Sequence, residues 1–249
     1  MKVLGIDVGG SGIKGAIVDL KTGSLVTDRV RYVTPQPARP RPMALKIAKI
    51  ADKLEWKGRI GVGFPAVIKN NVALSASNIA NSWIGTDAGK LISEVTGAKK
   101  VTVLNDADAA ALAEYEYGHR KMKKGLVIFI TIGTGLGTAF INNGVLVPNL
   151  ELGHMYLKKH GDAELYASNA TRKRKNLSWS VWGRRFNHVL EEMEALFQPD
   201  QFILGGGISK TPEFFAQYLT VDTPIRMATL MNEAGIIGAA LAGRGLRKS

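Results

Sequence analysis

The chain contains no cysteine among its 249 residues. Disulfide bonds and thiolate metal ligands are therefore excluded, which fits a reducing compartment. No apolar run approaches the roughly 18 residues that a membrane-spanning helix requires. The N-terminal sequence MKVLGIDVGG reaches Asp and Gly too early for a secretory signal. The sequence therefore predicts a cytoplasmic protein with no membrane partner.

Acidic residues are few beside basic ones, with 21 Asp and Glu against 33 Lys and Arg and a net charge of +12. Such a surplus favours a polyanionic partner, namely nucleic acid, an acidic membrane surface or a phosphate-rich substrate, although solubility alone can also account for it. A hydrophobic content of 45% excludes a disordered chain. The length allows one large domain or two small ones.

Strand and helix patterns alternate along the chain, which favours an α/β fold. KVLGIDVGGSGIKGAIVDL predicts two strands joined by a glycine turn, and the proline-rich segment 34–42 predicts a loop because proline cannot donate to a sheet. A strand, a glycine turn and a strand recur over residues 125–141. Ser178 is expected to cap a helix whose aromatic stripe belongs to the core. Other elements are expected at 59–66 (strand), 87–97 (helix), 101–104 (strand), about 107–118 (helix) and 231–243 (helix).

Two glycine turns carry the first chemical signal. The first has a carboxylate, a hydroxyl and a cation among its glycines: Asp7, Gly9, Gly10, Ser11, Gly12 and Lys14. Backbone N–H groups of such a turn can face an anion, yet the spacing matches neither a P-loop nor a dinucleotide fingerprint, and an ordinary hairpin turn remains possible. The second turn repeats the arrangement with Gly133, Thr134, Gly135 and Gly137. Together the two turns predict a clamp for phosphate groups.

The sequence VTVLNDADAAALAE places acidic residues where a predicted strand meets a helix. A carboxylate on Asp106 at the end of a strand would point into the usual ligand position of an α/β fold and accept a proton from a substrate hydroxyl. Asn105 can hydrogen-bond sugar hydroxyls. Asp108 is explained by the favourable interaction of an acid with the first turn of a helix.

Glu151 and His154 are three residues apart in ELGHM. A carboxylate and an imidazole at this spacing can bracket two sugar hydroxyls. They can equally belong to a surface turn or to half of a metal site.

These sequence motifs, in this order, resemble those of a known family. GIDVGGSGIKG, GVGFPA, LNDADAAALAE, TIGTGLGTAF, ELGH and ILGGGIS are similar to motifs of the ROK family of sugar kinases and repressors, within the superfamily that includes actin and hexokinase. SNIANSWIGTDA, VLVPNLELGH and RKNLSWSVWGRRFN resemble its polyphosphate glucokinase branch. The resemblance implies an α/β, actin-like ATPase (ribonuclease H-like) fold with two lobes and a central cleft. The expected lobes are 1–108, with a C-terminal helix within 233–249 packing back on it, and 109–232.

The same resemblance implies phosphoryl transfer from inorganic polyphosphate, or ATP, to the 6-hydroxyl of glucose. Asp106 would then be the general base. The sugar contacts would be Asn105, Glu151, His154, Asn78 and Glu164, and Asp7 would organise Mg²⁺ through water. Beside the two glycine turns, a third at Gly205, Gly206 and Gly207 would face the donor. Zinc is not expected, because the cysteines of the zinc site found in many family members are missing. A homodimer is expected.

Basic runs supply a candidate surface for the rest of a long polyphosphate chain, although such runs are commonly only solvated faces. The candidates are Arg120, Lys121, Lys123, Lys124, Arg172, Lys173, Arg174, Lys175, Arg184 and Arg185. One alternative is a hexose kinase that uses ATP alone. A DNA-binding repressor is disfavoured because the first strand begins at Lys2, where a helix-turn-helix would be needed, so no nucleic-acid partner is expected. A non-enzymatic sugar sensor is disfavoured by the intact Asp7 and Asp106.

Overall fold

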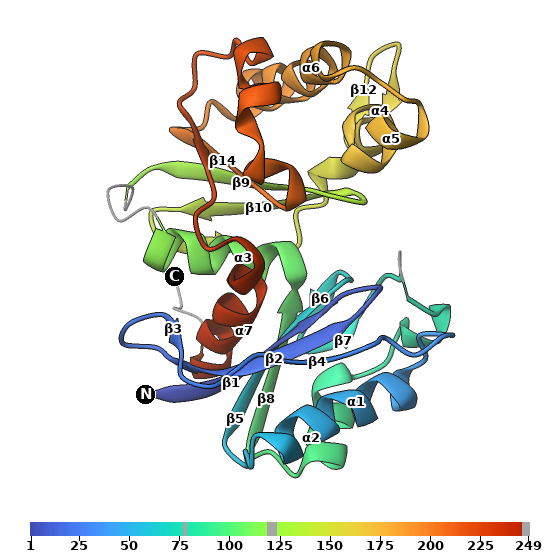
Figure 1. Ribbon diagram of the computed structural model, residues 1–249, viewed down its shortest axis with the longest axis vertical. Helices are drawn as coiled ribbons and strands as arrows, with labels where there is room; N and C mark the ends of the chain where they lie inside the picture. Colours follow the sequence, from blue (N-terminus) through green and yellow to red (C-terminus); the bar gives the residue numbers. More distant parts are fainter. Residues whose placement is uncertain (77–78, 119–123, 246–249) are drawn as a thin grey trace. The chain divides into compact units, whose positions relative to one another are not determined.

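The structure is a computed structural model that describes residues 1–76, 79–118 and 124–245 (Figure 1). The chain divides into two compact units: unit 1 combines Met1–Tyr117 with Glu233–Ser249, and unit 2 is Gly118–Asn232. The expected boundary at residue 108 falls inside helix α3 (Asp106–Ala113). Because α3 packs against the C-terminal helix α7 (Ala234–Arg244), the whole of α3 belongs to unit 1.

Unit 1 is built on a mixed sheet with the order β3-β2-β1-β5-β8, and β4 also pairs with β2. Strands β1, β5 and β8 are parallel, whereas β2 runs antiparallel to β1 and completes the predicted hairpin. Helices α1 and α2 complete the unit, with a short ribbon formed by β6 and β7. The bounds are β1 Lys2–Val8, β2 Ile13–Asp19, β3 Ser24–Leu25, β4 Val30–Tyr32, α1 Pro40–Lys53, β5 Arg59–Phe64, β6 Ile68–Lys69, β7 Val72–Ala73, α2 Ala88–Thr96 and β8 Lys100–Asn105.

The two faces of this sheet are packed in different ways. Leu4 and Ile6 of β1 join the apolar core that includes Met43 and Ile47 of α1. Glycine stands at the alternate position, and a methyl group on Gly5 would overlap the carbonyl oxygen of Ile236 in α7. Since residues alternate across a strand, Leu4 and Ile6 lie on the face toward α1, while the backbone at Gly5 contacts α7 on the other face.

Helix α1 begins at Pro40, so the proline-rich loop is shorter than the sequence indicated. Proline is compatible with the first turn of a helix, because the N–H groups there have no partner within the helix. Pro40 and Pro42 therefore lie inside the helix, and only the part before Pro40 is loop. The helix has an apolar face, with Met43, Ile47 and Ile50 buried.

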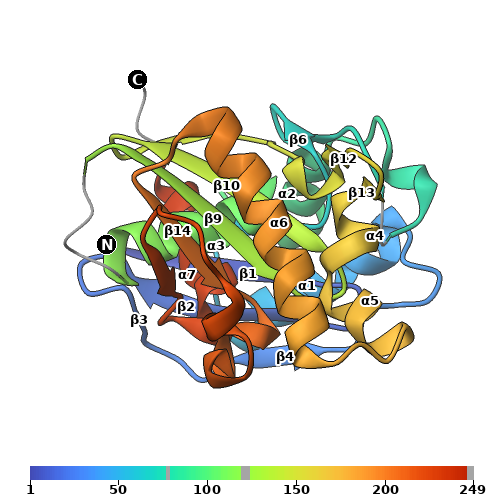
Figure 2. The same cartoon turned by 90° about the horizontal axis from the view of Figure 1, so that it is seen from above.

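Unit 2 repeats the strand, glycine turn and strand of unit 1. Its sheet has the order β11-β10-β9-β14-β15, in which β9 is antiparallel to β10 and parallel to β14. Helix α6 lies across this sheet (Figure 2), and its buried Trp182 and Phe186 pack with Ile128 and Ile130 of β9. The bounds are β9 Leu126–Ile132, β10 Leu136–Asn142, β11 Val145–Val147, β12 Tyr156–Leu157, β13 Gly161–Asp162, α4 Ala163–Ala167, α5 Asn169–Arg174, α6 Trp179–Phe197, β14 Gln201–Gly205 and β15 Ile225–Met227.

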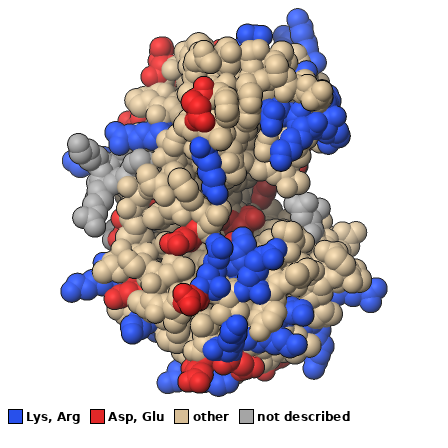
Figure 3. Space-filling view, viewed as in Figure 1, with Lys and Arg blue, Asp and Glu red and all other residues tan. Residues whose placement is uncertain are grey.

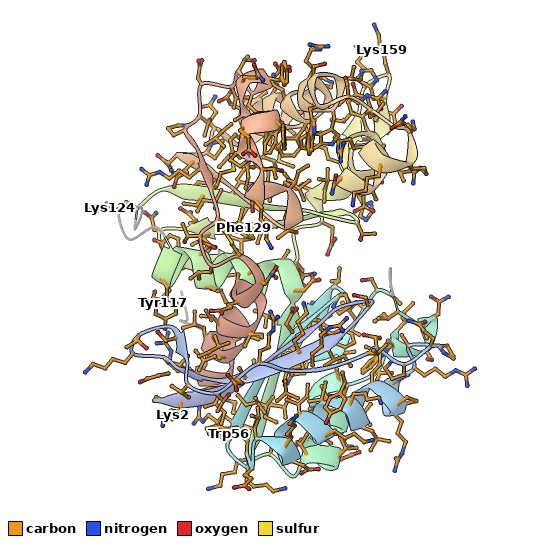
Figure 4. All side chains as sticks on the ribbon, viewed as in Figure 1. Lys2, Trp56, Tyr117, Lys124, Phe129 and Lys159 are labelled. Carbon is orange, nitrogen blue, oxygen red and sulfur yellow. The ribbon has the colours of Figure 1, made fainter. Side chains whose placement is uncertain are left out.

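The predicted α/β class and the predicted cap of the long helix are confirmed. The Oγ atom of Ser178 accepts the N–H of Val181 at 3.3 Å, so Ser178 is the N-cap of α6. Among the residues that the structure describes, no helix combines the length and apolarity needed to cross a membrane. Helix α3 continues as a π-helical turn, and Tyr117 at its end donates its hydroxyl to the carbonyl of Leu20 at 2.9 Å (Figure 4).

Replacement of Gly238 by Ala tests the contact between α7 and α3. Ala usually stabilises the interior of a helix by up to about 1 kcal/mol over Gly. Here the added methyl group would overlap the carbonyl oxygen of Ala109, so we expect Gly238→Ala to lower the free energy of unfolding by about 1–3 kcal/mol. The measurement is urea denaturation. Gly207→Ala is the control, because its methyl group meets nothing within 4 Å, and equal stability of the two variants would contradict the packing.

Candidate functional site

Strands β1, β5 and β8 end at one edge of the unit 1 sheet. In the parallel register, Asp7 lies beside Gly63, and Phe64 lies beside Asn105. Carboxyl ends of parallel strands are the usual ligand-binding edge of an α/β sheet. The register therefore brings Asp7 and the Asn105–Asp106 pair, which are far apart in sequence, to the same edge.

Two glycines line the space between these acids. A methyl group on Gly63 would stand 3.7 Å from the Cα atom of Asp106 and 3.8 Å from the carbonyl oxygen of Gly235. A methyl group on Gly235 would stand 2.9 Å from the carboxyl carbon of Asp7. The start of α7 is thus in direct contact with Asp7. Gly63 lies between this start of α7 and Asp106.

Asn105 has a structural role that the sequence did not reveal. It is the N-cap of α3, and its Oδ1 atom accepts the N–H groups of Ala107 at 2.8 Å and Asp108 at 3.2 Å. Its Nδ2 atom donates to the carbonyl of Ala66 at 3.2 Å. The side chain is buried. Asn105 therefore fixes the start of α3, and with it the position of Asp106.

The two aspartates of α3 differ in exposure. Asp106 is the first residue of the helix and is partly exposed, so its carboxylate is accessible to a ligand. Asp108 lies in the same first turn, as predicted, but its side chain is completely buried. Of the two acids, Asp106 is therefore the more accessible.

The first glycine turn is closed by two backbone hydrogen bonds, Gly9 N to Gly12 O at 3.0 Å and Gly12 N to Gly9 O at 3.3 Å. Within the described residues, the N–H groups of Gly10 and Ser11 have no acceptor. Both residues are exposed. Consecutive N–H groups of this kind form a concave site for an anion, so the local geometry fits the predicted role in phosphate binding.

The segment after β2 returns to this turn and holds its carbonyl groups. The Thr34 hydroxyl donates to Gly9 O at 2.6 Å, Gln36 Nε2 to Gly10 O at 3.5 Å, and Arg31 Nη2 to Ser11 O at 3.3 Å. Sequence reasoning missed these three contacts because they join residues about 20 to 26 positions apart. Lys14, which was expected near the phosphates, lies 3.1 Å from Asp7 Oδ2 and is paired with it.

The second glycine turn has the same organisation. Gly133 N donates to Gly135 O at 3.0 Å, and within the described part of the chain the N–H groups of Thr134 and Gly135 have no acceptor. The Glu164 carboxylate accepts the N–H of Leu136 at 2.9 Å and packs where a side chain on Gly135 would be. Glu164 thus supports the second turn through its contacts with Leu136 and Gly135. Its expected contact with the sugar stays a prediction.

The third glycine turn adjoins the second. Gly205 ends β14 and lies beside Thr131 of β9 in the parallel register. Gly206 has a φ of 82°, and a side chain there would contact the backbone of Ile132. Glycine is therefore required at Gly206 both for its backbone conformation and for space. The two turns share one edge of the unit 2 sheet.

Glu151 and His154 belong to an acidic cluster beside the second turn, in the 3-10 turn Leu152–His154 and the residue before it. His154 Nδ1 lies 2.8 Å from Asp162 Oδ2. This hydrogen bond raises the pKa of His154 above its usual value, and the nearby acids reinforce the rise against partial burial. Burial would raise the pKa of Asp162, yet its bonds with His154 and the backbone N–H of Leu165 leave that pKa lowered.

Glu151 is an exposed residue of unit 2, yet desolvation of its carboxylate by the surrounding protein raises its pKa. The charge of His154 opposes this rise and that of Glu164 adds to it. Asp162, which sequence reasoning missed, orients the imidazole: with Nδ1 bound to the carboxylate, Nε2 is left to meet a ligand. No group of three or more potential metal ligands occurs among the described His, Asp and Glu residues.

The basic residues of α5 are linked to the second glycine turn, because Ala170 of α5 donates its N–H to Gly133 O at 3.1 Å. Lys173, Arg174 and Lys175 are exposed, and Figure 3 shows Lys and Arg gathered over this part of unit 2. Arg172 stacks on the ring of Trp179 at 3.9 Å, and in α6 Arg185 lies over Tyr166 while Arg184 lies over Tyr218. Within the described ranges, none of these cations forms an ion pair.

Lys124 is not brought to this surface. Lys124 precedes β9 (Figure 4), whereas Gly133 follows this strand. At ~3.3 Å per residue, β9 separates Lys124 from Gly133 by roughly 25 Å. Lys124 and the cations of α5 therefore lie toward opposite ends of β9, and the role of Lys124 in polyphosphate binding stays a prediction. Its neighbours Arg120, Lys121 and Lys123 and the candidate sugar contact Asn78 lie outside the described residues.

Comparison with known proteins gives consistent matches. The ROK family model matches residues 3–165. A polyphosphate glucokinase of Mycobacterium tuberculosis is 45% identical over 238 residues, which cover 96% of this chain and 89% of that protein. The crystal structure of an inorganic polyphosphate/ATP-glucomannokinase from Arthrobacter sp. strain KM superposes with a TM-score of 0.92 at 45% identity, over 98% of each chain. A ROK glucokinase from Streptomyces griseus, in complex with glucose and AMPPNP, gives a TM-score of 0.83 at 24% identity, over 98% and 99% of the chains, which shows the shared fold.

The pair of His154 and Asp162 predicts a pH dependence. Because the folded-state pKa of His154 is raised, the pair stabilises the fold below the ordinary pKa of about 6.5 and ceases to do so as pH rises through the raised value. Asp162→Asn removes the carboxylate yet keeps an oxygen that can cap α4. We expect this change to lower the His154 pKa in a ¹H NMR titration, with His154→Gln identifying the signal. An unchanged pKa would exclude Asp162 as the cause.

Proposed function

Because the chain belongs to the ROK family, we propose that it transfers a phosphoryl group from inorganic polyphosphate, and also from ATP, to the 6-hydroxyl group of glucose. Relatives named polyphosphate glucokinase are 44% to 45% identical to it. One structural observation carries the proposal. Asp106 is partly exposed at the start of α3, at the sheet edge that also holds Asp7 and the first glycine turn.

Asp106 acts as the general base. Its carboxylate accepts the proton of the sugar hydroxyl while that oxygen forms a bond to the terminal phosphorus of the donor. The bond from this phosphorus to its bridging oxygen breaks, and the shortened polyphosphate or ADP leaves with the electron pair. Asn105 contributes by holding the N-terminus of α3, so that the carboxylate is fixed before substrate binds.

The glycine turns bind the donor phosphates. Each presents two consecutive backbone N–H groups and a hydroxyl, from Gly10 and Ser11 in one unit and from Thr134 and Gly135 in the other. Fixed dipoles of this kind stabilise charge on phosphate oxygens without having to reorganise during the reaction. Lys14 adds a positive charge beside the first turn.

Mg²⁺ fits the residues of unit 1 as an ion shared with the donor. Mg²⁺ is commonly held by one or two carboxylates together with substrate phosphates, and does not require a cage of protein ligands. Asp7 is partly exposed next to the first turn, and its Oδ2 atom contacts Lys14. Asp7 would hold the ion, directly or through water. When bound, Mg²⁺ supplies neutralisation of the negative charge on the phosphates.

Glu151 and His154 bind the sugar. The imidazole is oriented by Asp162, whose Oδ2 atom lies 2.8 Å from Nδ1, and Nε2 is left to form a hydrogen bond with the sugar. The exposed carboxylate of Glu151 accepts from hydroxyl groups. Because the Arthrobacter relative is named a glucomannokinase, mannose is a second acceptor worth testing. A homodimer remains a prediction of the family resemblance, and a cytoplasmic location and the absence of zinc and of nucleic-acid partners remain predictions from the sequence.

A polyphosphate chain longer than the turns can hold continues over α5. The helix is hydrogen-bonded to the second turn through Ala170 and Gly133. Exposed cations come directly after Ala170 in the sequence, and they have no carboxylate partner among the described residues. Polyphosphate carries about one negative charge per unit, so each unit beyond the turn can meet a cation. ATP has no such extension and would not reach these residues.

The first test is a coupled assay of glucose phosphorylation with Mg²⁺ and either polyphosphate or ATP as the only donor. We expect both donors to support turnover, and Asp106→Asn to lower kcat by roughly 10²-fold or more with little change in glucose affinity, the scale on which a positioned base contributes. Asp52→Asn, which changes an exposed acid of α1, is the control.

Two results would contradict these assignments. Near-normal turnover by a folded Asp106→Asn variant would remove Asp106 from the mechanism. Activity with ATP and none with polyphosphate would leave a hexose kinase that uses ATP alone.

The cations of α5 predict a salt-dependent preference for long polyphosphate. Neutralising phosphates with Lys and Arg releases counterions, so affinity falls as salt rises. We expect replacement of Lys173, Arg174 and Lys175 by Gln to raise the KM for long polyphosphate severalfold and to flatten its salt dependence. The KM values for tripolyphosphate, ATP and glucose should change little. Replacement of Lys49 and Lys53, exposed or partly exposed cations of α1, is the control for loss of charge. Equal effects on all donors would show that α5 does not bind the chain.

A further inference from the structure

Arg31 stands in an electrostatically unfavourable place. It lies directly opposite Lys14 in the antiparallel pairing of β4 with β2. Side chains of opposed residues share one face of a sheet, and like charges there repel each other. Asp7 neutralises Lys14 at 3.1 Å, but within the described residues no carboxylate lies within ion-pair distance of Arg31. The fold therefore holds an uncompensated cation at the first glycine turn.

The turn is shaped around this guanidinium group. A methyl group on Gly12 would stand 2.8 Å from Nε and 2.9 Å from Nη2 of Arg31. Gly12 does not have a positive φ, and the absence of a side chain there lets the guanidinium group lie against the backbone of the turn. Nη2 also donates to the carbonyl of Ser11 at 3.3 Å. The side chain is thus held against the turn although it is exposed.

We propose that Arg31 is a donor-binding residue, which contacts phosphate oxygens together with the N–H groups of Gly10 and Ser11. A guanidinium group has five N–H donors, and its planar arrangement matches the oxygens of a phosphate. The guanidinium group of Arg31 forms only one hydrogen bond among the described residues, to the carbonyl of Ser11. A bound phosphate would supply the missing counter-charge and would relieve the repulsion between Arg31 and Lys14.

Arg31 differs from the α5 cations in the part of the donor that it meets. It lies at the turn itself, so it contacts phosphates that polyphosphate of any length and ATP have in common. The α5 cations meet only a long chain. The choice of these two donors rests on the proposed function, whereas the binding of a short inorganic phosphate chain does not.

The experiment compares Arg31→Gln, Arg31→Lys and the control Arg41→Gln. Arg41 is an exposed cation in the first turn of α1 in the same unit. Titration calorimetry measures tripolyphosphate binding, and steady-state kinetics measures KM for tripolyphosphate, ATP and glucose. We expect Arg31→Gln to weaken tripolyphosphate binding by about tenfold or more, the scale of a lost charge-assisted hydrogen bond, and to raise both donor KM values. Arg31→Lys should restore part of the loss, while KM for glucose and the Arg41→Gln variant should match the wild type.

Thermal stability separates this role from a structural one. Removing a repelled charge should leave the Tm of Arg31→Gln equal to that of the wild type or higher, while donor binding falls. Unchanged tripolyphosphate affinity of Arg31→Gln would overturn the inference, whatever the Tm of the variant. If the wild type binds tripolyphosphate through Arg31 but phosphorylates no sugar, the proposed function is wrong and the role of Arg31 in binding stands.

Discussion

The candidate site in unit 1 depends on the close approach of α7 to the sheet. Glycines of β1 and β5 face this helix, and a side chain on Gly5 or Gly61 would overlap its backbone. At such distances there is no room for an added methyl group, so the sheet and α7 are held in close contact. The start of the helix is consequently held against Asp7 through Gly235. A segment from the end of the chain thereby completes a site whose acids come from its first half.

The same design, a strand that ends in a turn with unpaired N–H groups, occurs once in each unit. In unit 1 the turn is held from outside by Arg31, Thr34 and Gln36, and in unit 2 by Glu164 and α5. The different supports fit the different tasks proposed for the two units. Unit 1 supplies the proposed base and metal ligand, while unit 2 supplies the proposed sugar contacts and the cations for a long phosphate chain. In the proposed function the shared turn binds phosphate, and the supports provide what is specific to each unit.

Local patterns predicted the elements well, and long-range contacts account for what was missed. The hairpin at the start of the chain, the strand end before Asp106 and the cap at Ser178 follow from residues that are neighbours in sequence. Arg31 and Glu164 support turns that lie 20 and 28 residues away in the sequence. No local pattern reveals such contacts. For Asn105 the sequence did not indicate the cap of α3, because an amide at a strand end suits a sugar and a helix cap equally, and its contact with the sugar stays a prediction.

The central claim is that both glycine turns bind the phosphates of the donor through their backbone N–H groups. An amide ¹H–¹⁵N NMR titration with tripolyphosphate and Mg²⁺ measures this directly, because a hydrogen bond from an N–H to a phosphate oxygen moves its proton signal downfield. The account predicts such shifts for Gly10 and Ser11 in unit 1 and for Thr134 and Gly135 in unit 2. Saturating tripolyphosphate that left the amides of either turn unmoved would contradict it.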